Sequence, residues 1–274
     1  MDPYVQMPDF TQSYNRYSYG WNNPLRYADK NGKFLGTILT FIIDLIETAF
    51  FDGGLDPTSN HARDNAWKQF DPTANWSKTN HAWKIDKGLW ETDPNRNFWQ
   101  RTWQLFSRFT WEGLQTGVGT LYSHIRNVTG NVDRVDYFGG VTFVTNEHSK
   151  NHNGVTLGNY ININMKDEIF GDFENWVLND PMYMHEYGHT LDSQGWGPLY
   201  LFAIGIPSAI SAWTSDYISK WDGKYITNPH GLYEHDVYWT ERRANKRAAK
   251  YFKKYYDIDW ETLYPDYPLE NPFK

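Results

Sequence analysis

The chain contains no cysteine among its 274 residues. Disulfide bonds and thiolate metal sites are therefore excluded, and a metal ion would have to be bound by histidine, aspartate or glutamate side chains. The chain also lacks an excess of positive charge, because 26 Lys and Arg stand against 33 Asp and Glu, which gives a formal net charge of −7. This balance provides no electrostatic footprint for nucleic acid and argues against a nucleic-acid partner.

Long apolar runs are scarce as well, and none reaches the roughly 20 residues that a helix needs to cross a bilayer. The longest, residues 34–51, carries polar residues every three or four positions and predicts an amphipathic helix. Residues 199–213 are interrupted by a glycine and a proline. We interpret both as core or interface elements, with membrane contact by the first as an alternative.

The first 30 residues are polar and aromatic and contain no apolar segment of the kind found in a signal peptide. We therefore expect a protein that is secreted or delivered without such a signal, or else a cytoplasmic one.

The most informative motif in the chain is His185-Glu186-Tyr187-Gly188-His189. Histidines at positions i and i+4 lie on one face of a helix, so both imidazoles can reach a single metal ion. The glutamate after the first histidine is placed to accept a proton from a metal-bound water. The motif indicates a metal hydrolase.

Asp180 and Pro181 predict the start of the helix that carries this motif, because they form a cap followed by proline, and we expect the helix to run to about Gly195. Both histidines are expected to be neutral, each donating its second ring N–H to a nearby acceptor. One Zn²⁺ per chain fits two imidazoles, a carboxylate and an open position for water.

The third ligand must come from elsewhere in the chain, and Glu241 is the first candidate because it begins a strongly helical segment that reaches Tyr256. Asn245 lies one turn further, so its amide oxygen could hold a ligand imidazole in the required tautomer. The other candidates are Glu234, His230 and His235. A surface glutamate that pairs with a neighbouring arginine is the ordinary alternative for Glu241.

The pair of motifs His185-Glu186-x-x-His189 and Glu241-x-x-Ala244-Asn245 resembles the gluzincin metallopeptidases. This resemblance implies a zincin-like fold, zinc ligation by His185, His189 and Glu241, Glu186 as the general base, and a protein or peptide substrate. The family has aspartate where this chain has Asn245, which removes a negative charge beside the ligands.

A peptidase also needs a donor for the oxyanion of the tetrahedral intermediate. His235, Tyr238 and His230 are the candidates, with His235 first because it lies six residues before Glu241. Asp192 lies seven residues after His185 on the same helix face, so it either orients a ligand or acts in capping and solvation.

The first 33 residues resemble the end of the RHS/YD-repeat core domain, through Asn15-Arg16-Tyr17-Ser18-Tyr19, Asn22-Asn23-Pro24-Leu25 and Asp29-Lys30-Asn31-Gly32. The family has Asp-Pro where this chain has Asp29-Lys30, which removes the basis for self-cleavage here. The resemblance implies a core remnant over 1–33 and a metallopeptidase-like effector domain over 34–274, with the zinc-site region at 130–256. It also implies a polymorphic toxin with an immunity protein as partner. A non-enzymatic binding or membrane-active module, and a zinc hydrolase of a non-peptide amide, are the alternatives.

The remaining periodicities predict an α+β fold that is mainly helical. Asp93-Pro94 predicts the start of a helical segment that reaches about Asn127, and four aromatic residues at helical spacing predict its buried face. They are Trp99, Trp103, Phe106 and Phe109.

Residues 141–145 and 155–163 predict two strands of a small β-sheet or hairpin packed near the His185–His189 helix. Such a hairpin could offer an edge strand to an extended peptide. The loop between the strands contains His148 and His152, which we interpret as surface histidines.

Overall fold

The computed structural model describes residues 76–222 and 234–272. The chain divides into two compact units, Met1–Lys87 and Gly88–Lys274. The described part of the first unit is helix α3 (Trp76–Lys87). The predicted core remnant over 1–33 and the predicted helix over 34–51 lie outside the described residues.

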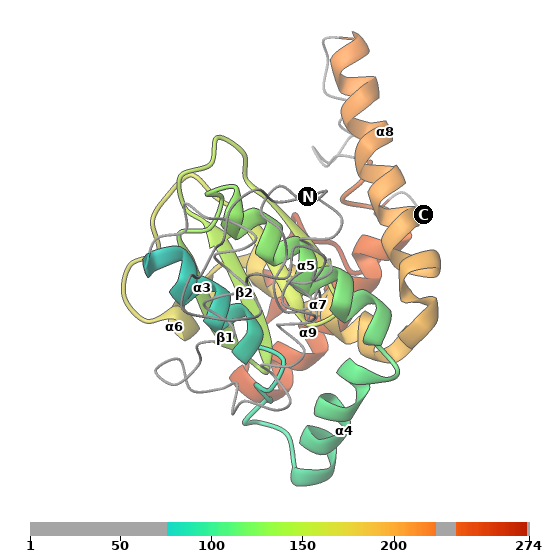
Figure 1. The fold of residues 1–274 in the computed structure, drawn as a ribbon. Coiled ribbons are helices and arrows are strands. Elements are labelled where there is room, and N and C mark those ends of the chain that lie inside the picture. Colours follow the sequence, from blue (N-terminus) through green and yellow to red (C-terminus); the bar gives the residue numbers. More distant parts are fainter. Residues whose placement is uncertain (1–75, 223–233, 273–274) are drawn as a thin grey trace, which may run out of the picture. The chain divides into compact units, whose positions relative to one another are not determined.

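The second unit contains the remaining elements, labelled in Figure 1 where there is room. Its helices are α4 (Phe98–Phe109), α5 (Gly113–Val128), α6 (Phe173–Asn179), α7 (Pro181–Trp196), α8 (Ile206–Asp222), α9 (Trp239–Tyr256) and α10 (Trp260–Leu263). A 3-10 turn, η3 (Gly197–Leu199), and a π-helical turn, η4 (Leu201–Gly205), join α7 to α8. Its strands are β1 (Arg134–Phe138), β2 (Val141–Asn146), β3 (Asn153–Leu157) and β4 (Tyr160–Asn164). The expected α+β class is confirmed. Over the described ranges, no helix combines the length and apolar character needed to cross a membrane.

The four strands form one mixed sheet in the order β1-β2-β4-β3. β1 pairs antiparallel with β2, β2 pairs parallel with β4, and β3 pairs antiparallel with β4. The prediction of one strand over 155–163 is wrong, because the chain turns at Gly158, whose φ of 63° suits glycine, and returns as a second strand. As a result β3 lies at the edge of the sheet.

The sheet has helices on both faces, and β4 shows how its residues alternate between them. Ile161 and Ile163 point into the apolar core under α7, whereas Asn162 faces α5. There the Asn162 amide exchanges hydrogen bonds with the Ser123 hydroxyl and accepts one from Arg126 at 3.4 Å. The α5 face of the sheet is therefore held largely by polar contacts, and the α7 face by apolar packing.

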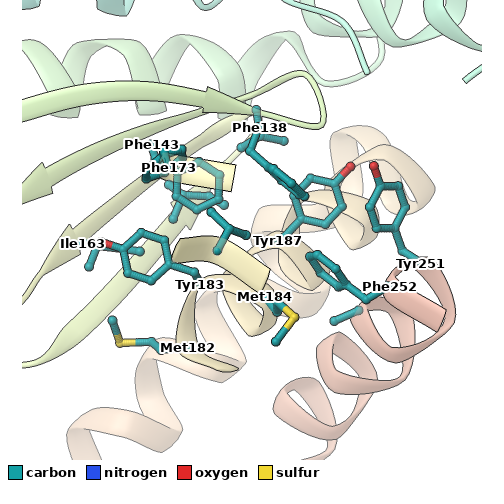
Figure 2. Close-up of a cluster of buried hydrophobic side chains, with 14 of the residues drawn as sticks. Phe138, Phe143, Ile163, Phe173, Met182, Tyr183, Met184, Tyr187, Tyr251 and Phe252 are labelled. Carbon is teal, nitrogen blue, oxygen red and sulfur yellow. The ribbon is translucent and has the colours of Figure 1, made fainter. Parts of the chain in front are cut away.

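Aromatic rings dominate the core between the sheet, α7 and α9 (Figure 2). Phe143 of β2 stacks on Tyr183 of α7, with ring centroids 5.5 Å apart. Phe138 of β1 stacks on Phe252 of α9 at 5.8 Å. These contacts bind α7 and α9 to the same sheet, so the core fixes the two helices that carry the candidate site.

Helix α7 begins where the sequence predicts. The carboxylate of Asp180 accepts a hydrogen bond from the backbone N–H of Met182 at 2.9 Å, and Pro181 occupies the first turn. The helix ends at Trp196, next to Gly197 with a φ of 52°.

Helix α4 differs from the prediction in its start and in its orientation. Asn97, not Asp93, caps it, in a capping box with Gln100. The aromatic residues expected to be buried are exposed: Trp99 by 77%, Phe106 by 57%, and Trp103 and Phe109 to a smaller extent. The opposite, polar face of the helix is the one that packs against the rest of the unit.

Candidate metal centre

Two helices bring the three predicted ligands together. His185 and His189 project from one face of α7, and Glu241 projects from the first turn of α9. One ligand atom from each residue lies within 4.8 Å of the others, and all three side chains are largely buried. Over the described residues, this is the one group of three histidine or carboxylate side chains whose ligand atoms lie that close together.

The distances in this cluster fit a tetrahedral zinc site. Oε2 of Glu241 lies 3.2 Å from Nε2 of His185 and 3.1 Å from Nε2 of His189. Zinc–ligand bonds of about 2.0–2.1 Å in tetrahedral geometry separate neighbouring ligand atoms by about 3.3–3.4 Å. The two distances from Glu241 to the histidines are therefore compatible with zinc bound between these side chains.

The electrostatics of the cluster favour positive charge. Burial alone would raise the pKa of Glu241, but the two imidazoles outweigh it and hold this pKa well below its usual range. Burial would likewise lower the pKa of His189, but the Glu241 carboxylate raises it to about 9. Glu241 thus stays ionised while His189 retains a proton, and a bound cation would supply the same positive charge.

Asn245 orients His185 through a hydrogen bond. Its Oδ1 lies 2.6 Å from Nδ1 of His185, and its Nδ2 donates to the backbone carbonyl of Pro268 at 3.0 Å. A carbonyl can only accept, so Pro268 fixes which end of the amide faces His185. The imidazole must then carry its proton on Nδ1, which leaves Nε2 free to bind a metal.

The second histidine departs from the expectation that each ligand donates to an acceptor. Nδ1 of His189 is buried and has no hydrogen-bond partner among the described residues. Asp192, one turn further along α7, accepts instead from Nε of Arg243 at 2.7 Å through Oδ1. Arg243 of α9 is therefore the partner of Asp192, which accepts no hydrogen bond from either ligand histidine among the described residues.

Glu186 faces the edge strand β3. Its Oε2 accepts a hydrogen bond of 2.5 Å from the Thr156 hydroxyl, which also reaches the Glu186 backbone carbonyl at 3.1 Å. A side chain at Gly154 would overlap the Glu186 carboxylate. Thr156 and Gly154 were not foreseen, because only the strand pairing brings them to α7.

A second glycine lets the two site helices approach each other. A Cβ atom at Gly188, inside the histidine motif, would overlap the backbone carbonyl oxygen of Ala244 on α9. This close approach brings Glu241 within reach of the two histidines. The motif therefore supplies the packing surface for α9 as well as the ligands.

The other predicted site residues lie in different places. His235 is half-buried, with Nε2 3.9 Å from Oε2 of Glu241 and Nδ1 3.2 Å from the Ser211 hydroxyl. Glu234 is exposed and outside the cluster. Tyr238 immediately precedes α9, and its ring lies beside Trp239. His230 lies outside the described residues.

The two loop histidines are exposed, as expected. His148 pairs with Asp133 at 3.0 Å, and this carboxylate contact raises the pKa of His148.

Tyr267, which sequence reasoning missed, packs its ring 5.7 Å from the ring of His185. It reaches the site from the segment after α10.

Comparisons with protein-family models, with curated proteins and with solved structures found no match for this chain.

Proposed function

We propose that the chain is a zinc-dependent metallopeptidase with a zincin-like fold. The observation that carries the proposal is the position of Oε2 of Glu241, at 3.2 and 3.1 Å from the Nε2 atoms of His185 and His189. Two imidazoles and one carboxylate are a common ligand set of catalytic zinc, and they leave a fourth position for water.

A zinc ion bound by these residues would lower the pKa of its water and polarise the carbonyl of a bound peptide. Glu186 accepts the proton of the attacking water and passes it to the leaving amine. The Thr156 hydroxyl donates a hydrogen bond to Oε2 of Glu186 and so fixes the position of the carboxylate.

His235 is the first candidate for the oxyanion donor, and Tyr238 is the second. When the Ser211 hydroxyl donates to Nδ1 of His235, the neutral imidazole carries its proton on Nε2, the nitrogen nearer to Glu241. A donor in that position can stabilise negative charge on the substrate oxygen.

The edge strand β3 supports a peptide as the substrate. β3 is paired on one side, by β4, and it carries Thr156 to Glu186. An extended peptide that adds to the outer edge of β3, where the Tyr200 hydroxyl donates to the Thr156 carbonyl at 3.4 Å, would form backbone hydrogen bonds beside the general base.

We further propose that this activity serves as the effector of an RHS-type toxin, on the resemblance of residues 1–33. The proposal implies an immunity protein and a delivered location. Expression inside a susceptible cell should arrest growth for the wild type and not for Glu186→Gln, whereas equal toxicity of the two would exclude hydrolysis as the cause.

The metal is tested by elemental analysis of purified wild type, His189→Ala and Glu241→Ala. We expect about one zinc per wild-type chain and a loss in both variants. Retention in Glu241→Ala would move the third ligand to another residue, with His235 first. A wild type that binds no zinc after reconstitution would end the hydrolase proposal.

The reaction is tested on a mixed peptide library with wild type, Glu186→Gln and Glu234→Gln. Glu186→Gln should keep its zinc and lose at least about 100-fold in rate, because general-base catalysis typically contributes that much. The exposed Glu234 serves as the matched control and should leave the rate unchanged. Cleavage of non-peptide amides alone would favour a different hydrolase.

A further inference from the structure

Helix α4 turns its apolar side outward. Phe98 is 71% exposed and Trp99 is 77% exposed, whereas Gln104, Ser107 and Arg108 of the same helix are almost completely buried. A helix packed on a protein core normally has the opposite arrangement, with its apolar side inward. Outward aromatic residues of this size are typical of an interaction surface.

The polar face of α4 is fixed by hydrogen bonds. Gln104 accepts from the backbone N–H of Asp93 at 2.8 Å and donates to the carbonyl of Gly139 at 3.1 Å. Arg108 donates to the carbonyls of Leu89, at 2.8 Å, and Gly140. Rotating the helix to bury its aromatic face would break these bonds, so the outward orientation is built into the fold.

A groove of about 640 Å³ adjoins the exposed face, between α4 and the helices α7 and α9. Trp99 and Trp103 belong both to the groove and to the aromatic face. The groove is lined by four basic and four aromatic side chains: Arg96, Arg247, Lys250, Lys254, Trp99, Trp103, Tyr251 and Tyr255. Arg96 pairs with the buried Asp93 and Arg247 with the buried Asp192, so the basic character of the groove rests on Lys250 and Lys254. In a chain with a net charge of −7, this is a local basic site that is complementary to an anion.

We propose that the α4 face and its basic groove bind the surface of a membrane that contains anionic lipids. Exposed Trp and Phe beside Lys and Arg are the combination that inserts at the boundary between headgroups and acyl chains. A 12-residue helix is about 18 Å long, shorter than the roughly 30 Å hydrocarbon core, so α4 would lie along the surface. The groove cations would contact lipid phosphates. This inference does not depend on the proposed peptidase activity.

The test is flotation of the full chain with phosphatidylcholine vesicles, with and without phosphatidylglycerol. The double variant Lys250→Gln/Lys254→Gln should bind the anionic vesicles roughly 30-fold more weakly, since each lysine near such a surface contributes about fivefold. The double variant Trp99→Ser/Trp103→Ser should lose most of the remaining binding. High salt should weaken the wild type.

Two single variants serve as matched controls. Lys246→Gln removes a lysine of α9 that pairs with Glu270, and Trp213→Ser removes an exposed tryptophan of α8. Both should bind vesicles like the wild type. An unchanged circular dichroism spectrum in every variant would show that the fold is intact.

The proposal is overturned if the wild type does not float with anionic vesicles. It is also overturned if the two double variants bind as well as the controls. Binding to polyglutamate but not to vesicles, lost in Lys250→Gln/Lys254→Gln, would instead assign the groove to an acidic protein partner.

Discussion

The side-chain amide of Asn245 links the ligand His185 to the backbone of the segment that contains Pro268. It accepts from His185 on one side and donates to the Pro268 carbonyl on the other. Where the resembled peptidases have aspartate, this chain thus has a neutral residue whose orientation is fixed by the backbone.

We expect Asn245→Ala to weaken zinc binding by about 10–100-fold, because loss of such a partner releases the ring orientation and tautomer of the ligand. Asn245→Asp should retain most of the affinity, since it keeps the acceptor. Competition with a chromophoric chelator measures both. Lys246→Gln, at the next position, is the control, and equal affinity of Asn245→Ala and wild type would refute the role.

Gly188 and Gly195 lie two turns apart on α7, but only the first touches α9 backbone. A Cβ at Gly188 would overlap the Ala244 carbonyl, whereas a Cβ at Gly195 would approach the flexible end of Arg247 at 3.2 Å. The approach of the two site helices therefore depends on one glycine.

Gly188→Ala should lower the free energy of unfolding by about 1–3 kcal/mol. It should also reduce zinc affinity roughly tenfold, because the added methyl group pushes α9 away from α7 and zinc binding must then bring Glu241 back toward the histidines. Gly195→Ala should be neutral or more stable by up to about 1 kcal/mol, from helix propensity. Chemical denaturation with and without zinc measures both effects, and similar behaviour of the two variants would contradict this account.

Glu112, at the start of α5, accepts one hydrogen bond from α4 and one from α7. The hydroxyls of Ser107 and Ser193 donate to its two carboxylate oxygens at 2.6 and 2.7 Å. Burial raises the pKa of Glu112 above its ordinary value of 4.5, although both hydrogen bonds oppose the shift. The folded state therefore binds this proton more tightly than the unfolded state does.

This sign predicts a pH-dependent difference between wild type and Glu112→Gln. The stabilisation from the protonated carboxyl is complete below pH 4.5 and is lost as the pH rises through the folded-state pKa. The variant should thus gain stability relative to wild type as the pH rises above 4.5, and the difference should level off above the folded-state pKa. Urea unfolding at a series of pH values measures the gap, and a gap that is constant with pH would contradict the assignment.

The segment after α10 returns to the ligands from the end of the described chain. Tyr267 packs on His185, and Pro268 holds Asn245, while Trp260 donates from its indole to the Tyr267 carbonyl at 2.9 Å. A backbone carbonyl cannot be removed by a side-chain substitution. Truncation is therefore the direct test.

A chain that ends at Leu263 should bind zinc about tenfold more weakly, for the same reason as Asn245→Ala. The two changes act on one hydrogen-bonded unit. The truncated Asn245→Ala chain should therefore bind zinc no more weakly than whichever of the two single variants binds it less tightly. Full additivity would show that the segment acts independently of Asn245. Thermal unfolding of the same proteins separates loss of packing from loss of the metal contact.

The sequence by itself was sufficient for the features set by local spacing. These include the cap at Asp180, the helices that carry His185, His189 and Glu241, and the α+β class. Helical periodicity and capping depend on residues within a few positions of each other, so they are readable without a fold.

Contacts between distant segments were decided by the tertiary structure alone. Sequence spacing could not show that Thr156 reaches Glu186 or that Pro268 orients Asn245, because these pairs are 30 and 23 residues apart. It also predicted the wrong face of α4, since an amphipathic pattern identifies two faces but not which one is buried. The buried partners of Gln104 and Arg108 made that choice, because hydrogen-bonding groups taken out of water must be satisfied.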